Sequence, residues 1–158
     1  MTKTVEITNA IELRKKGFFE KSRNVLLSLI SKGQDCGIIY LNIAWAYDNQ
    51  GLEEEALGYY MKALNEPLST DDYFESKFGL ACTYRCLGEF NKAKLIFEEL
   101  TIEYPSKIEI IPFFSLCLMS LGEKDSAFKM LLELLIKYPP TDAVSSYRKA
   151  LTGYVNEI

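Results

Sequence analysis

The chain has 158 residues, of which 48% are apolar and 25% are charged, and its formal net charge is −4. This composition is typical of one globular domain, residues 1–158, with a sizeable core. A weakly acidic chain without blocks of lysine and arginine lacks the positive charge that nucleic-acid backbones require of a partner. We therefore expect no binding to nucleic acid.

The first 21 residues alternate charged and apolar side chains and show no apolar core of a secretory signal. The longest uncharged run, residues 110–122, contains Pro112 and is too short for a membrane span of about 20 residues. These features favour a soluble cytoplasmic protein that does not bind membranes.

Four glycines divide the chain at nearly regular intervals. Gly17, Gly51, Gly88 and Gly122 are separated by 34, 37 and 34 residues. A small residue stands five positions after each glycine and another stands seven positions before it. The residues after the glycines are Ser22, Ala56, Ala93 and Ala127, and those before them are Ala10, Ala44, Ala81 and Ser115. We expect each glycine to end one helix and the small residues to let two antiparallel helices approach closely.

In chain order, this pattern predicts four helix pairs, at residues 3–36, 37–70, 74–107 and 108–141. Residues 71–73 form an insertion that should lengthen the first helix of the third pair, with Thr70 or Asp71 as its N-cap. Pro105 and Pro139 should stop the second helices of the last two pairs. Pro112 should either lie in the first turn of a helix that begins near Ile111 or kink that helix.

The tail, residues 142–157, is predicted to be a ninth helix. One side carries an apolar stripe, consisting of Val144, Tyr147, Leu151, Tyr154, Val155 and, just beyond, Ile158. Such a helix should cover the exposed apolar edge of the fourth pair. A role in seeking a partner is the less favoured interpretation.

The segments WAYDNQGLEEEALGYYMKAL and GLACTYRCLGEFNKAKLIFEEL resemble tetratricopeptide repeats, and specifically those of small stand-alone bacterial proteins. The resemblance implies an all-α, right-handed superhelical array of four helix hairpins plus a C-terminal capping helix. It also implies a non-enzymatic interaction module, with homodimerisation as an open alternative. The resemblance is specific for the fold and much less so for the function.

In such an array, one side of each first helix lines a concave wall, the default binding surface. The candidate partner-binding residues on this wall are Ile7, Ile11, Leu41, Asn42, Trp45, Asn49, Phe78, Cys82, Arg85, Phe113 and Leu116. Position 12 of the first three repeats supplies charges along one rim, namely Arg14, Asp48 and Arg85. We expect a partly apolar peptide or protein segment to bind there. The alternative is that a second copy of the chain covers the wall, and plain packing between helices also remains open.

No further chemistry is expected. The chain has no histidine and no phosphate-binding, hydrolase or zinc-protease motif, so we predict no enzyme activity, no cofactor and no metal. Cys82 and Cys86 lie four residues apart and are interpreted as small residues that leave room in the groove, with redox or metal roles as weaker alternatives. Some tetratricopeptide proteins clamp the free carboxylate of chaperone tails. The corresponding residues here include Glu75, which would repel an anion, so that specialisation is not expected.

Overall fold

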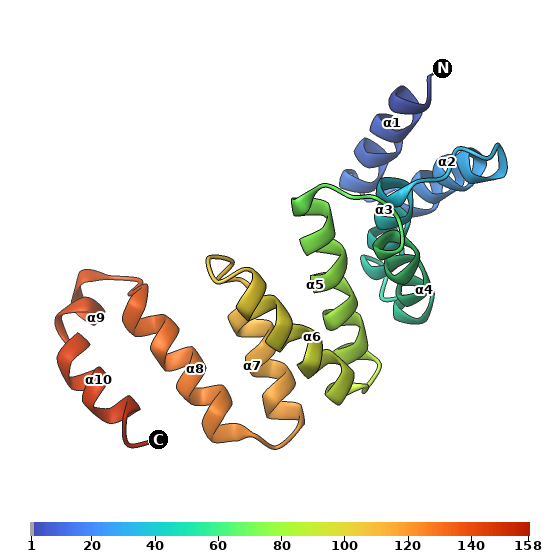
Figure 1. Ribbon diagram of the computed structural model, residues 1–158. Coiled ribbons are helices and arrows are strands. Elements are labelled where there is room, and N and C mark those ends of the chain that lie inside the picture. The colour runs from blue at the N-terminus through green and yellow to red at the C-terminus, as the bar shows by residue number, and fades with distance from the viewer. Residues whose placement is uncertain (1) are drawn as a thin grey trace. The chain divides into compact units, whose positions relative to one another are not determined.

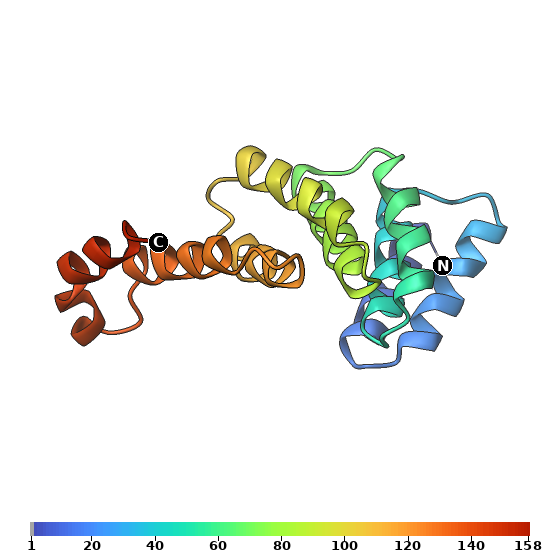
Figure 2. The same cartoon turned by 90° about the horizontal axis from the view of Figure 1, so that it is seen from below.

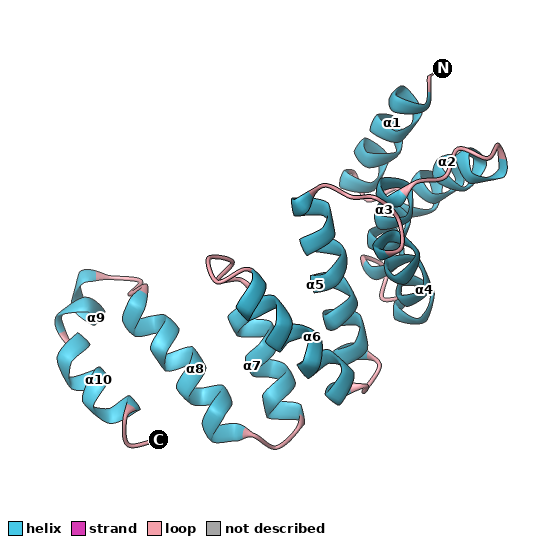
Figure 3. Cartoon of the chain, viewed as in Figure 1, coloured by secondary structure: helices cyan, strands magenta, loops and turns pink. Residues whose placement is uncertain are grey.

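Helices and the loops that join them make up residues 2–158, the part of the chain that the computed structural model describes (Figure 3). No strand occurs in that range, which confirms the predicted all-α fold. None of the described helices is both long and apolar enough to cross a lipid bilayer. In chain order (Figure 1), they are α1 (Lys3–Lys15), α2 (Phe19–Ser31), α3 (Gly37–Asp48), α4 (Glu53–Leu64), α5 (Thr70–Cys86), α6 (Phe90–Glu103), α7 (Ile110–Ser120), α8 (Lys124–Lys137), α9 (Asp142–Ser146) and α10 (Arg148–Val155).

The four predicted glycines end helices in the left-handed conformation. Gly17, Gly51, Gly88 and Gly122 have φ of 83°, 70°, 80° and 81°. After α1, the Phe18 amide donates to the Leu13 carbonyl at 2.9 Å, and the Gly17 amide donates to the Arg14 carbonyl at 2.9 Å. These bonds satisfy carbonyls that have no partner inside the helix. The regular glycine spacing therefore marks a helix ending that recurs along the chain.

The small residues at the fixed offsets are buried where helices meet. Each is at most 1% exposed: Ala10, Ser22, Ala44, Ala56, Ala81, Ala93, Ser115 and Ala127. In the first pair, the Ser22 hydroxyl donates to the Ala10 carbonyl at 2.7 Å, so a polar side chain is satisfied inside the close contact between α1 and α2. Small side chains at these positions let the helices approach without leaving voids.

The chain divides into two compact units, with the boundary between Gly88 and Glu89. In unit 1, α1 packs on α2 and α3 packs on α4, while α2 contacts α3 and α4 contacts α5. In unit 2, α6 packs on α7, α7 on α8, and α8 on α10. The boundary falls inside the predicted third repeat, 74–107. The organisation of residues 1–158 as a single domain stays a prediction.

Two helix starts refine the predictions. The insertion at residues 71–73 does lengthen α5, but the N-cap is Ser69 rather than Thr70 or Asp71. The Ser69 hydroxyl oxygen accepts a hydrogen bond from the Asp72 amide at 3.1 Å, which satisfies a donor of the first turn. Pro112 lies in the first turn of α7, which begins at Ile110. A proline is tolerated there because its missing N–H would have had no helical partner.

The tail is not one helix but two, α9 and α10, interrupted at Tyr147. The Ser146 hydroxyl donates to the Ala143 carbonyl at 2.7 Å, and the Tyr147 amide turns instead to the Val144 carbonyl at 3.1 Å. At the break, a serine hydroxyl thus bonds to a backbone carbonyl. α10 folds back onto α8, and α9 connects the two (Figures 1 and 2). Only Val155 of the tail is buried, so the predicted cap is a small one.

Candidate partner-binding surface

The predicted wall residues come from four helices. α1 carries Ile7 and Ile11, α3 carries Leu41, Asn42 and Trp45 with Asn49 just after its end, and α5 carries Phe78, Cys82 and Arg85. All nine belong to unit 1, where α3 contacts both α1 and α5. Phe113 and Leu116 lie on α7 in unit 2, and both side chains are exposed there. The structure therefore brings the first nine residues onto three neighbouring helices.

Two of these nine residues lie in the interior. Leu41 is fully buried and Asn42 is 1% exposed, so neither presents a surface to a partner. The Asn42 amide nitrogen donates to the Ile38 carbonyl one turn earlier at 2.8 Å. The physical reason is that α3 is covered on several sides, because α1, α2, α4 and α5 all contact it. Helical periodicity alone did not reveal how many neighbours this helix has.

The other wall residues of unit 1 remain accessible to different degrees. Asn49 is exposed, and the rest are half-buried: Ile7, Ile11, Trp45, Phe78, Cys82 and Arg85. Ile7 packs partly against the core formed by α1, α2 and α3. The Phe78 ring stacks on the buried Phe74 ring with centroids 5.7 Å apart, which fixes its position on α5. Cys86, the second cysteine of the pair on α5, is exposed.

The indole of Trp45 lies under a cation. The guanidinium carbon of Arg14 is 4.7 Å from the centroid of the Trp45 ring, a stacked cation–π contact between α1 and α3. Arg14 was predicted to lie on the charged rim, but it was not among the candidate binding residues. The signal was its position 12 in the repeat, which also holds Asp48 and Arg85.

Asp48, at the end of α3, is hydrogen-bonded to α4. The Tyr60 hydroxyl donates to Asp48 Oδ2 at 2.8 Å, and the Tyr60 side chain is 1% exposed. Burial raises the pKa of Asp48 because it disfavours the charged carboxylate, and the hydrogen bond from Tyr60 opposes this shift. Burial, and after it the neighbouring Asp48, raise the pKa of Tyr60 well above its usual value. Tyr60 therefore stays neutral and acts as a donor.

In unit 2, α8 exposes an apolar face. Phe128 is 57% exposed and Leu131 is 41% exposed, and Leu135 and Tyr138 are also exposed. A hollow of about 480 Å³ lies along this face, lined by Phe128, Leu131, Leu132, Leu134, Leu135, Tyr138 and Pro140. We call Phe128, Leu131, Leu135 and Tyr138 the α8 face. It was not among the predicted binding residues, because the tail was expected to cover it.

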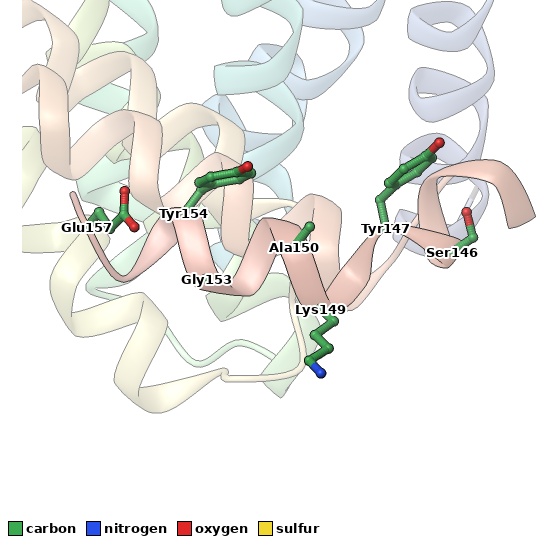
Figure 4. Close-up of a pocket in the computed structure, with 7 residues that line it drawn as sticks. All are labelled: Ser146, Tyr147, Lys149, Ala150, Gly153, Tyr154 and Glu157. Atoms are coloured by element: carbon green, nitrogen blue, oxygen red, sulfur yellow. The ribbon is translucent and has the colours of Figure 1, made fainter.

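The outer side of α10 forms a second hollow, shown in Figure 4. It is lined by Ser146, Tyr147, Lys149, Ala150, Gly153, Tyr154 and Glu157. The rings of Tyr147 and Tyr154 project to one side of the helix, and Lys149 points to the other. Both tyrosine side chains are more than 60% exposed, so the predicted stripe of the tail is only partly used for packing.

One side of α1 differs from the equivalent side of α3 and is mostly polar. Thirty-four residues later, the equivalent positions of α3 hold Ile39, Ile43 and Ala46, which are fully buried. In α1 these positions hold Val5, Asn9 and Glu12, and all three side chains are exposed. This side of α1 is therefore exposed to water.

Known proteins share this architecture. The profile of a family described as "Tetratrico peptide repeat" matches residues 37–158, from the second predicted repeat to the end of the chain. No curated protein matches the chain.

Two solved structures also superimpose on it. YrrB, described as a TPR protein with an unusual peptide-binding site, has a TM-score of 0.72 at 14% identity, and the match covers 89% of this chain and 71% of YrrB. MamA of AMB-1 has a TM-score of 0.68 at 17% identity, covering 98% of this chain and 90% of MamA. At these identities the likeness shows the fold alone. Because the family profile matches most of its length, the chain belongs to the tetratricopeptide repeat family.

Proposed function

We propose that the protein is a non-enzymatic scaffold that holds a partly apolar peptide or protein segment against the first helices of unit 1. Proteins of this family are generally interaction modules, which supports the coarser part of the proposal. The surface we propose contains Ile11, Trp45, Phe78 and Arg85, which are half-buried, and it leaves out the buried Leu41 and Asn42. Phe113 and Leu116 stay a separate prediction for α7.

Trp45 is the residue on which this proposal depends most. It is the only tryptophan in the chain, and it stands on α3, the helix that contacts both α1 and α5. Its side chain is half-buried although most of α3 around it is fully buried. Tryptophan is enriched among the residues that dominate binding energy, because its large ring gains much from losing contact with water.

The test is capture of proteins from a lysate of the source cells by the wild-type protein and two double variants. Trp45→Ala with Phe78→Ala should lose most of the captured proteins, whereas Phe128→Ala with Leu131→Ala, which removes similar apolar surface from α8, should retain them. Thermal melting should first show that all three proteins are folded. Identical captured sets for all three proteins would contradict the proposed surface.

A second candidate function is self-association, which the α8 face favours. Contiguous apolar patches of this kind are uncommon on monomeric soluble proteins and often mark a contact with another chain. In this version, a second copy of the chain would cover Phe128, Leu131, Leu135 and Tyr138.

Light scattering over a concentration series tests self-association. A dimer that becomes a monomer on changing Leu131 and Leu135 to lysine would support the α8 face as the interface. A dimer that is broken by Trp45→Ala instead would place self-association on unit 1. A monomer at every concentration would leave only the scaffold proposal.

The remaining expectations are also proposals. We propose a cytoplasmic protein whose partners are proteins or peptides rather than nucleic acid or membranes, and which needs no cofactor or metal. Substrate turnover by the purified chain, or loss of folding on treatment with a chelator, would contradict this view.

A further inference from the structure

Arg14 is a stacked cation without a counterion. Its Nε atom is out of contact with solvent and has no hydrogen-bond partner, and no carboxylate in residues 2–158 lies within ion-pair distance of it. Its guanidinium carbon lies over the Trp45 ring. Burial lowers the pKa of Arg14 because desolvation disfavours its charged form, and the nearby Tyr60 opposes this only in part. The site thus carries a desolvation cost that an anion would offset.

Arg23 shows what a satisfied stacked arginine looks like in the same unit. Its guanidinium carbon lies 4.3 Å from the centroid of the Tyr47 ring, and its Nη1 atom donates to the Ala46 carbonyl at 3.2 Å and to the Gln50 side chain. Arg14 has the same stacking contact but none of these hydrogen bonds. Stacking alone therefore does not account for the unused donors of Arg14.

The chemistry of a guanidinium identifies the missing partner. Its planar fork of N–H donors matches a carboxylate, which can accept two parallel hydrogen bonds from it. The Arg14 side chain as a whole is half-buried rather than enclosed, which leaves room for a ligand to approach it.

A carboxylate suits this position better than a phosphate. Asp48 lies one turn after Trp45 on α3, and one of its oxygens is already occupied by the Tyr60 hydroxyl. The negative charge of an ionised Asp48 beside Trp45 would repel a phosphate dianion more strongly than a carboxylate monoanion. A carboxylate is therefore the better partner for Arg14.

We propose that the segment bound at Trp45 carries an aspartate or glutamate whose carboxylate pairs with Arg14, next to an apolar side chain that lies on the indole. This inference rests on the proposed scaffold function and names the chemistry of its partner. It differs from capture of a chain terminus, because the acid is a side chain within the segment. Arg85, at the same repeat position on α5, also has a buried Nε without a partner and offers a second charge on this surface.

The test is selection from a library of random peptides whose ends are both blocked, so that no terminal carboxylate can bind. The selection is run on the wild-type protein, on Arg14→Gln, on Trp45→Ala and on the control Arg23→Gln. Wild type and Arg23→Gln should enrich peptides with an acidic residue beside an apolar one. Arg14→Gln should still enrich apolar residues but lose the preference for the acid, and Trp45→Ala should select few peptides.

Titration of a selected peptide, monitored by the fluorescence of Trp45, makes the test quantitative. Replacing the peptide's Glu with Gln should weaken binding to the wild type about tenfold or more, since a hydrogen-bonded charge is lost. The same replacement should have little effect on binding to Arg14→Gln, and Arg14→Lys should be intermediate because it retains the charge without the fork.

The outcomes separate this inference from the scaffold function. Peptides that depend on Trp45 but show no acidic preference, or the same preference with Arg14→Gln, would overturn the carboxylate and leave the scaffold intact. Failure to select any peptide that depends on Trp45 would overturn both. Selection of phosphorylated over acidic peptides in a matched library would overturn the choice of a monoanion.

Discussion

The first and last predicted repeats have a leucine at the same position of their second helices, but this side chain is buried in the first repeat and exposed in the last. Leu26 on α2 is fully buried, and Leu131 on α8 is 41% exposed. Both stand nine residues after the glycine of their repeat. The difference lies in the next part of the chain, because α2 is covered by the 12-residue helix α3, whereas α8 is succeeded by α9 and α10, of 5 and 8 residues. An apolar position in a repeat is thus buried only if the next helix is long enough to cover it.

The largest expected effect comes from truncating the two leucines. Leu26→Ala should cost about 2–5 kcal/mol, because it opens a cavity in a closed core, and Leu131→Ala should cost less than about 1 kcal/mol. Urea unfolding monitored by circular dichroism gives both values. Equal costs would show that the α8 face is covered in solution and would remove the basis of the comparison.

Glycines provide a second contrast between the covered interface and the tail. At Gly79 on α5, an added Cβ would overlap the Tyr60 ring, whereas at Gly153 on α10 it would meet nothing within 4 Å. Gly79→Ala should therefore cost about 1–3 kcal/mol by overpacking the interface between α4 and α5. Gly153→Ala should stabilise the tail by roughly 0.5–1 kcal/mol, since alanine favours the helix. Thermal melting of the two variants should show shifts of opposite sign.

The smallest expected effect is the dependence of stability on pH that arises from the Asp48 carboxylate. Because burial raises the pKa of Asp48 above the usual 3.8, ionisation of this group opposes folding. Its contribution to stability is fully present below pH 3.8 and is lost as the pH rises through the pKa of the folded state. Asp48→Asn keeps an acceptor for the Tyr60 hydroxyl and cannot ionise.

The free energy of unfolding of this variant should therefore rise relative to wild type as the pH increases from acid to neutral, by less than in either contrast above. Urea titrations at several pH values measure the difference. Glu54→Gln, at an exposed carboxylate on α4, controls for the change in net charge. A falling difference would mean that the ionised carboxylate stabilises the fold.

Local chemistry made much of the fold predictable. The glycines required for left-handed helix ends and the small residues required for close helix contacts are fixed by sterics within a few residues, so Gly51 and Ala56 could be assigned from the sequence alone. The position of Pro112 in the first turn of α7 was predictable for the same reason, since a proline constrains its own φ and lacks an N–H.

The rest depends on contacts between distant residues, which periodicity does not contain. The burial of Asn42 depends on how many helices surround α3, and the exposure of Leu131 depends on the length of the helices after it. The pairing of Arg14 with Trp45 joins residues 31 positions apart, and the repeat pattern gave only the side of the helix on which each would lie. The apolar periodicity of the tail likewise gave no sign of the break at Tyr147.

The polar side of α1 and the apolar α8 face should respond differently to an added repeat. An extra repeat spliced in ahead of α1 would have to pack against Asn9 and Glu12, which prefer water. A repeat duplicated between Lys137 and the tail would instead meet Leu131 and Leu135, exposed apolar side chains against which a new first helix could pack. Lengthening of this protein, whether by gene duplication or by an engineer, should therefore succeed at its C-terminal side.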